Sequence, residues 1–253
     1  MLTDQRLSKI LEIIKQNEFA KVEELASMLN VSTMTIRRDL QRLNDQGLLL
    51  RRHGGATALS VSYDEQSYLD KEMANPEGKG KIAQTAVALV KNGDTIFLDS
   101  GTTTMHIAKQ LRSRKDLTVI TNDVVIALEL SETDVQLIML GGIMQSSTKT
   151  IISSMAIEML QKFRVTTAFI GTSSVNREFD LFTPTMDKAY LKPVAIQIAQ
   201  TAYLVVDSTK FYAQSLYKWG SLSDFDGVIT DKDFTAAERK QAEQLKIKII
   251  SAL

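Results

Sequence analysis

Apolar residues recur at helical spacing along the first part of the chain. Four of them follow the i, i+3, i+4, i+7 spacing of a helix that is buried on one side: Leu7, Ile10, Leu11 and Ile14. A second, shorter helix is expected at about 22–29, and Ser32 is suited to cap a third helix at about 33–46. Two helices joined by so short a turn predict a helix-turn-helix.

A β-hairpin is expected directly after the third helix. Residues 48–53 and 56–61 favour strands, and the Gly54-Gly55 pair between them suits a type I′ turn, whose two central residues both take a positive φ. A helix-turn-helix followed by such a hairpin is typical of a winged helix. The sequence therefore predicts a winged helix-turn-helix DNA-binding domain over residues 1–60.

The pattern changes at about residue 79, where short β-branched runs begin to alternate with helical segments. The expected strands lie at 95–98, 117–121, 136–140, 167–170, 202–206, 227–230 and 247–250. The expected helices lie near 80–91, 104–112, 123–131, 155–163, 187–200 and 235–246. This alternation predicts βαβ units, and hence an α/β domain over 79–253 with a mostly parallel sheet covered on both faces. The polar stretch 61–78 is expected to be a linker, which can include a short helix at about 65–73.

The overall composition excludes several classes of protein. Apolar residues make up 44% of the chain and charged residues 24%, which is ordinary for a globular protein and unlike a disordered or fibrous one. The absence of cysteine excludes disulfides and thiolate metal sites, and with only two, distant histidines we expect no metal and no cofactor. We see neither a signal peptide nor an apolar run of ~18 residues, so we expect a cytoplasmic protein without a membrane partner.

The net charge of the chain is zero, but basic residues gather locally. Residues 33–53 hold five arginines against two aspartates. If the third helix turns Ile36, Leu40 and Leu43 inward, its hydroxyls and arginines face outward near its N-terminus, as in helices that enter the major groove. The residues expected to contact DNA are Ser32, Thr33, Thr35, Arg37, Arg38, Gln41, Arg42, Arg51, Arg52, His53 and Gly54. The alternative is a solvated amphipathic helix whose arginines pair with aspartates.

Small polar residues follow several of the expected strands. The segment 99–104, Asp-Ser-Gly-Thr-Thr-Thr, joins a strand to a helix and can offer N–H groups, hydroxyls and the positive end of a helix to an anion. It lacks the ending of a nucleotide P-loop, and a plain strand-to-helix turn is the alternative. Because parallel strands share one carboxyl edge, we expect a site there for a small anionic ligand such as a sugar phosphate. Its expected residues are Asp99, Gly101, Thr102, Thr103, Thr104, Thr121, Asn122, Gly141, Gly142 and Lys210.

These motifs carry a family resemblance. Residues 6–57 resemble the DeoR-type winged-helix regulators through Val31-Ser32, Thr35-Ile36-Arg37-Arg38-Asp39-Leu40 and Arg52-His53-Gly54-Gly55-Ala56. The second half looks like the sensor domain of that family, which is related in fold to sugar-phosphate isomerases, through Asp99, Gly101-Thr102-Thr103, Thr121-Asn122, Gly141-Gly142 and Asp207-Ser208-Thr209-Lys210-Phe211. The resemblance implies a regulator of a sugar-metabolism operon, expected to be a repressor, whose affinity for double-stranded operator DNA responds to a phosphorylated sugar or a similar metabolite.

The match to the family is looser in three places. Where the family usually has glycines, near position 153 and after Gly171, this chain has Ser153-Ser154, Thr172-Ser173-Ser174 and Glu178-Phe179-Asp180. These departures leave the shape of one side of the pocket, and the identity of the ligand, open. The segment 187–192 matches only loosely, and through it the resemblance makes Lys192 a candidate second phosphate contact.

Two other functions stay open at this point. One is a sugar-phosphate isomerase-like enzyme with an attached DNA-binding domain, for which Asp99, Asp187 and Asp207 are candidate bases without an assignable acid. His106 is expected to be a structural residue of a helix. The other is a winged helix joined to an oligomerisation platform, which would not need the polar strand ends. The main expectation is a non-enzymatic regulator that acts as a homodimer or homotetramer on two-fold operators.

Overall fold

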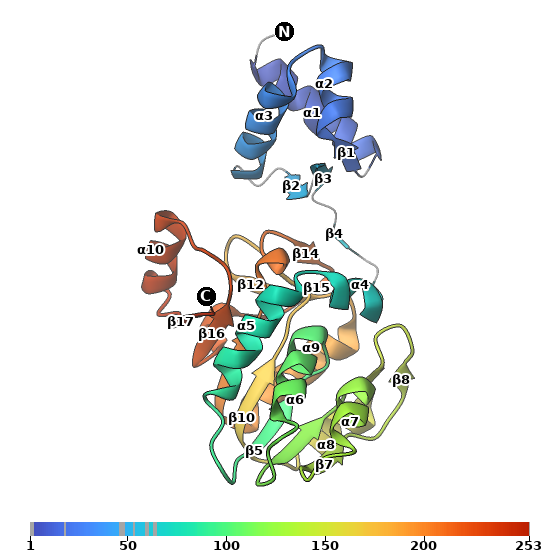
Figure 1. Ribbon diagram of the computed structural model, residues 1–253, viewed down its shortest axis with the longest axis vertical. Helices are drawn as coiled ribbons and strands as arrows, with labels where there is room; N and C mark the ends of the chain where they lie inside the picture. Colours follow the sequence, from blue (N-terminus) through green and yellow to red (C-terminus); the bar gives the residue numbers. More distant parts are fainter. Residues whose placement is uncertain are drawn as a thin grey trace. The chain divides into compact units, whose positions relative to one another are not determined.

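The computed structural model describes residues 3–17, 19–45, 49–52, 54–58, 61–62 and 65–252. His53, an expected DNA contact, lies outside them. The chain divides into two compact units, residues 1–61 with 212–214, and residues 62–211 with 215–253 (Figure 1). The short strands β4 (Val61–Ser62) and β14 (Gln214–Ser215) lie where the chain passes from one unit to the other.

The first unit is a winged helix. Its helices are α1 (Thr3–Asn17), α2 (Val22–Leu29) and α3 (Thr33–Asp45), and its strands are β1 (Phe19–Lys21), β2 (Leu49–Arg52) and β3 (Gly55–Ala58). The strands form an antiparallel sheet of order β1-β3-β2. The core consists of the residues that helical spacing turns inward, among them Leu7, Ile10, Ile14, Leu25, Ile36, Leu40 and Leu43. The predicted helix-turn-helix and hairpin are confirmed, whereas the three-residue strand β1 is too short to be recognised in the sequence.

The turn of the hairpin differs from the sequence-based expectation. Arg52 pairs with Gly55 across the hairpin, so the loop consists of residues 53 and 54, and Gly55 already belongs to β3. Gly54 has a φ of 80°, but Gly55 is not among the residues with positive φ. Gly55 is instead required by close packing, because a Cβ there would lie 2.3 Å from the carbonyl oxygen of Ala20. A type I′ turn centred on Gly54-Gly55 is therefore wrong.

A buried ion pair joins α1 to α3. Nε of Arg6 donates to Oδ2 of Asp39 at 2.5 Å, and the two side chains are only 12% and 6% exposed. Asp39 thus faces the interior of the unit, away from the arginines beside it on α3. The aspartate of the Arg-Arg-Asp-Leu motif consequently serves packing between helices, and it leaves the positive charge of Arg37 and Arg38 on the opposite, exposed side.

The second unit is built on a seven-stranded sheet of order β17-β16-β13-β10-β5-β6-β7, in which all neighbouring strands are parallel. Its strands are β5 (Thr95–Leu98), β6 (Thr118–Thr121), β7 (Gln136–Met139), β10 (Val165–Ile170), β13 (Ala199–Val205), β16 (Gly227–Thr230) and β17 (Ile249–Ser251). The helices that alternate with them are α5 (Pro76–Val87), α6 (Thr102–Leu111), α7 (Val124–Leu130), α8 (Ser154–Leu160), α9 (Met186–Gln197) and α10 (Ala236–Gln244). The predicted α/β fold with a mostly parallel sheet is confirmed.

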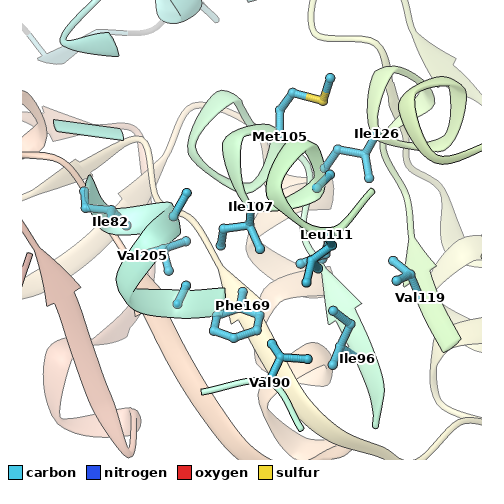
Figure 2. Packing of buried hydrophobic residues seen from close by; sticks show 14 of the residues in the cluster. Ile82, Val90, Ile96, Met105, Ile107, Leu111, Val119, Ile126, Phe169 and Val205 are labelled. Carbon is cyan, nitrogen blue, oxygen red and sulfur yellow. The ribbon is translucent and has the colours of Figure 1, made fainter. Parts of the chain in front are cut away.

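Helices cover both faces of this sheet. On one face, α5, α6 and α7 pack on β5, β6 and β10 through a continuous apolar cluster that includes Ile82, Ile107, Leu111, Val119 and Phe169 (Figure 2). On the other face, α9 packs against β10 and β13 and also against α8. Burial on both faces explains why the middle of each strand is mostly apolar and does not alternate with polar residues.

The strand order reverses beside β5. From β5 the chain moves outward through β6 to β7, then returns to β10 on the other side of β5 and continues outward to β13, β16 and β17. Ligands of open α/β sheets bind beyond the carboxyl ends of the strands at such a reversal. Here that position is flanked by Asp99, which follows β5, and Gly171, which follows β10.

Short elements complete the second unit. β11 (Ser174–Val175), β12 (Asp180–Thr183) and β15 (Tyr217–Ser221) form an antiparallel sheet, and β8 (Met144–Gln145) pairs with β9 (Thr150–Ile151). Two 3₁₀ turns, η1 (Ser208–Lys210) and η2 (Leu222–Asp224), follow β13 and β15. No described helix is long and apolar enough to cross a bilayer.

Residues 61–78, for which the sequence predicts a linker with a short helix, contain that helix as α4 (Tyr68–Met73). They also contain the first turn of α5, which starts earlier than the sequence predicts. The side chain of Asn75 caps α5 by accepting the N–H of Gly78 at 3.1 Å, and Pro76 occupies the first turn. Asparagine followed by proline is a helix-start signal as well as a loop signal, which explains the difference.

We expect Asp39→Ala to destabilise the first unit by about 3 kcal/mol, because removing one partner of a buried pair leaves the other charge uncompensated. Thermal unfolding of the full chain, followed by circular dichroism, measures this loss. The exposed Arg38→Ala is the control and should change stability by less than about 0.5 kcal/mol. The double variant Arg6→Met/Asp39→Leu should recover most of the loss; an equal effect of Arg38→Ala would contradict the role of the pair.

Candidate DNA interface and effector site

Helix α3 presents an exposed polar stripe opposite its buried face. Arg37, Arg38, Gln41 and Arg42 are exposed, whereas Ile36, Asp39, Leu40 and Leu43 are buried. Thr33 is exposed at the start of the helix. The N-terminal half of α3 therefore offers guanidinium and amide groups to a partner, and these are the groups that pair with guanine, adenine and phosphate.

Ser32 and Thr35 are engaged with each other at the start of α3. The N–H of Thr35 donates to Oγ of Ser32 at 3.1 Å, and the two hydroxyl oxygens lie 2.9 Å apart. Ser32 thus caps the helix as the sequence predicts. Its hydroxyl is already hydrogen-bonded to that of Thr35. Thr33, by contrast, is exposed at the start of the helix.

The hairpin is tied to α3 at the same surface. Nη1 of Arg51 donates to Oε1 of Gln41 at 2.8 Å, and the N–H of Arg51 donates to Oδ1 of Asn44 at 3.1 Å. Together α3, the hairpin and the start of α2 enclose a hollow of about 690 Å³, lined by Val22, Glu23, Arg37, Gln41, Asn44, Arg51, Arg52 and Gly54. Three arginines against one glutamate give this hollow a positive charge. The structure therefore brings five of the predicted DNA contacts, from the helix and the wing, to one concave surface: Arg37, Gln41, Arg51, Arg52 and Gly54.

The candidate anion loop lies between β5 and α6. Gly101 has φ 156° and ψ 164°, a conformation that is essentially restricted to glycine. Its N–H donates to Oδ2 of Asp123 at 3.1 Å, and its carbonyl accepts the hydroxyl of Thr104 at 2.8 Å. Helix α6 starts at Thr102, so its first N–H groups have no acceptor within the helix. They can hydrogen-bond an anion in front of the loop.

An ion pair occupies the position where the strand order reverses. Nζ of Lys192 lies 2.5 Å from Oδ2 of Asp99 and donates to the carbonyl of Gly171 at 2.8 Å, while the N–H of Gly171 donates to the same carboxylate at 3.1 Å. Both side chains are at most 5% exposed. Lys192 also lies 5.4 Å from the centre of the Trp219 ring. The lysine that the family resemblance singles out therefore lies directly beside Asp99.

The polar residues after β6 are buried and mostly engaged within the protein. The Thr121 hydroxyl donates to the carbonyl of Leu98 at 2.8 Å, and the Asn122 amide donates to the carbonyl of Ile151 at 3.3 Å. Oδ1 of Asn122 is buried, and the described residues offer it no hydrogen-bond donor. Burial raises the pKa of Asp123 to about 6, against three backbone N–H groups that lower it. These residues shape the rim of the sheet, and Asn122 keeps one unused acceptor there.

The remaining predicted ligand residues lie farther out on the rim. Gly141 and Gly142 are exposed after the edge strand β7, and a Cβ on Gly142 would lie 2.4 Å from Oγ of Ser153. Lys210 is half-buried in η1, which follows β13. β13 is two strands from β5, which is roughly 10 Å at the usual strand spacing. Lys192, by contrast, contacts Asp99, two residues before Gly101.

Several charged residues that the sequence does not single out lie beside this rim. Nζ of the fully buried Lys79 donates to the carbonyls of Lys71 and Ala74, and burial lowers the pKa of this lysine. Thr102 donates to the same Lys71 carbonyl at 3.5 Å. The start of α6 therefore contacts the segment that runs from residue 65 to α5.

Glu65 anchors that segment to α9. Its carboxylate contacts Lys71 and accepts from Nζ of Lys188 at 2.7 Å. Burial raises the pKa of Glu65, but the two lysines outweigh it and hold the pKa below its usual value. Burial also lowers the pKa of Lys188 to about 8. The spacing of Lys188 and Lys192, one helical turn apart, is the one signal in the sequence that points to this cluster.

His106, for which the sequence predicts a structural role, is half-buried on α6. Its Nε2 lies 3.4 Å from Oε1 of Glu72 on α4, and burial lowers its pKa. Asp187, another candidate base, is exposed at the start of α9. The described residues contain no group of three or more metal-ligating side chains that could hold a metal ion.

Comparisons with known proteins agree with this geometry. The model of the DeoR-like helix-turn-helix domain matches residues 6–61, and that of the DeoR C-terminal sensor domain matches residues 74–232. An uncharacterized regulator named FruR from Bacillus subtilis is 35% identical over 99% of both chains. The glycerol-3-phosphate regulon repressor of Escherichia coli is 33% identical over 91% of this chain and 92% of its own. The lactose phosphotransferase system repressor of Lactococcus lactis is 34% identical over 95% of both.

One family model thus covers the winged helix with its arginine-lined hollow, and the other covers most of the parallel sheet with its anion loop. The chain belongs to the DeoR family of DNA-binding transcriptional regulators.

Proposed function

We propose that this regulator is a repressor of a sugar-metabolism operon, and that residues 1–60 bind its operator while residues 79–253 bind a phosphorylated effector. The observation that carries the DNA-binding part is the hollow that Arg37, Arg51 and Arg52 share. With α3 in the major groove, a phosphate backbone passing through this hollow would contact the wing arginines. The full proposed contact set is Ser32, Thr33, Thr35, Arg37, Arg38, Gln41, Arg42, Arg51, Arg52, His53 and Gly54.

The effector proposal rests on the start of α6. The loop at Gly101 offers helix N–H groups, and Lys192 and Lys210 supply positive charge from the same rim. Asp99 and the unused acceptor of Asn122 suit the hydroxyls of a sugar. The Escherichia coli relative is named as the repressor of a glycerol-3-phosphate regulon, and a regulon for a phosphorylated metabolite is in keeping with a small phosphorylated ligand. The other proposed contacts are Thr102, Thr103, Thr104, Thr121, Gly141 and Gly142.

We propose that the second unit senses its ligand without turning it over. An isomerase needs a carboxylate base that can reach a substrate proton. Of the three candidate bases, Asp99 is held by Lys192 and by the N–H of Gly171, and Asp187 is exposed. Asp207 is buried, and its Oδ1 accepts the N–H of Thr209 at 3.0 Å. Assays of isomerisation on a panel of aldose phosphates test this; turnover that disappears in Asp99→Asn would favour an enzyme.

An operator with two-fold symmetry requires two winged helices, so we propose that the chain acts in the cytoplasm as a homodimer or homotetramer. Light scattering of the purified chain, with and without operator DNA, measures the number of copies. A chain that stays monomeric on the operator would contradict this assembly.

We expect Arg37→Ala and Arg38→Ala to weaken operator binding. A lost base contact should cost about 1–3 kcal/mol, and a lost phosphate contact should reduce the slope of affinity against salt by about one. The measurement is a titration of an operator, selected from random DNA by the wild-type chain, at two salt concentrations. Lys162→Ala removes an equal charge from an exposed site of the second unit and serves as the control. Unchanged affinity and slope in folded Arg variants would contradict the assignment of α3.

We expect Gly101→Val and Lys210→Ala to weaken effector binding. Valine at Gly101 is strained at that φ and blocks approach to the loop, while a lost charge-assisted contact of Lys210 costs roughly 1.5–3 kcal/mol. Trp219 is the single tryptophan and lies beside Lys192, so its fluorescence reports binding from a panel of sugar phosphates and glycerol 3-phosphate. Gly80→Ala, where a Cβ meets nothing within 4 Å, is the control. Normal binding by both variants would place the site elsewhere.

A further inference from the structure

Met34 is an apolar side chain in the middle of a surface made for polar contacts. It is 64% exposed in the first turn of α3, although the core of the first unit is otherwise built from apolar residues with little exposure. Among the described residues of this unit, the other exposed large apolar side chains are Phe19 and Met28. A single exposed apolar side chain is ordinary on a protein surface, so the position of Met34 among the polar side chains of α3, and not its exposure alone, is what points to a partner.

The position of Met34 on the helix points to that partner. Arg37, Arg38 and Gln41 follow it at i+3, i+4 and i+7, so all four side chains lie on one exposed stripe. The buried residues Ile36, Leu40 and Leu43 lie on the opposite side. Met34 is the first member of the stripe, and in a helix-turn-helix the first residues of the second helix are those that reach base edges.

The chemistry of methionine narrows what it can contact there. Its thioether has no hydrogen-bond donor, and its flexible chain adapts to apolar surfaces. Thymine carries the only apolar group that the four bases present in the major groove, the C5-methyl. The neighbours of Met34 on the helix, Arg37, Arg38 and Gln41, carry hydrogen-bond donors. They are better suited to the polar edges of bases.

We propose that Met34 determines operator specificity by packing on the methyl group of a thymine in each half-site. This inference rests on the proposed operator binding and names one base that the site selects. Arginine and glutamine then read neighbouring edges or phosphates, and Met34 excludes cytosine at its own position because cytosine lacks the methyl group.

The test is a double-mutant cycle that combines a substitution in the protein with the removal of a single methyl group from the DNA. The full-length wild-type chain selects an operator from random double-stranded DNA, and each thymine of that operator is replaced in turn by uracil, which removes only the methyl. At one thymine per half-site, uracil should weaken wild-type binding about fourfold, the worth of one buried methyl-sized group. Met34→Ala should bind the thymine operator no more tightly than the wild-type chain binds the uracil operator. Its affinity should not fall further when that thymine becomes uracil.

Met28→Ala is the matched control, because it removes an equally exposed methionine, 66% exposed, from α2. It should keep the full response of the wild type to uracil. Additive losses for Met34→Ala and uracil, or an equal weakening of Met34→Ala on all sequences, would overturn the contact with thymine while leaving operator binding intact. If the wild-type chain selected no sequence at all, the proposed DNA binding itself would fall, and this inference with it.

Discussion

The ion pair between Asp99 and Lys192 holds together the place where the strand order of the sheet reverses. Through Lys192 it joins the ends of β5 and β10 to helix α9, and the ring of Trp219 on β15 closes over the same ammonium group. Two buried charges stabilise a fold only while each has its partner. The phosphorylated ligand proposed to bind in front of the α6 loop would bring a second anion to this pair. Its binding free energy would then include the cost of loosening, or sharing, the contact between Lys192 and Asp99.

The segment from residue 65 to α5 lies beside this pair and is fixed by buried charges of its own. Glu65 is held by Lys71 and Lys188, and Lys79 holds the carbonyls at the end of α4. Thr102, the first residue of α6, donates to one of those carbonyls. The stretch of chain that follows the winged helix thus contacts the loop that is proposed to hold the phosphate. An effector that moves Thr102 changes a hydrogen bond of that stretch, which is the kind of differential contact that coupling between two sites requires.

The sequence predicts the elements of both units well, because their apolar periodicity is strong, and it predicts the polar strand ends because a parallel sheet places them on one edge. It is less informative about what each polar group contacts. Thr121 looks like a ligand residue but donates to the carbonyl of the neighbouring strand, and Asp39 looks like a partner of nearby arginines but binds Arg6. Glu65 and Lys188 are 123 residues apart, and no local pattern reveals such a pair. The prediction of a type I′ turn at Gly54-Gly55 is wrong for a similar reason, because the constraint on Gly55 comes from close packing against β1 across the sheet.

The two units use their basic residues in opposite ways. In the winged helix, Arg37, Arg38 and Arg52 are exposed, so binding DNA there mainly releases the counterions of the phosphates. In the sensor unit, Lys79 and Lys192 are buried and already engaged, so an anion must compete with contacts that the fold itself uses. Binding of DNA at the exposed surface would leave the internal contacts of its unit in place, whereas binding of an anion at the proposed effector site would exchange contacts of the buried rim. If the proposed effector site is correct, it is the part of the molecule at which a ligand would change the structure.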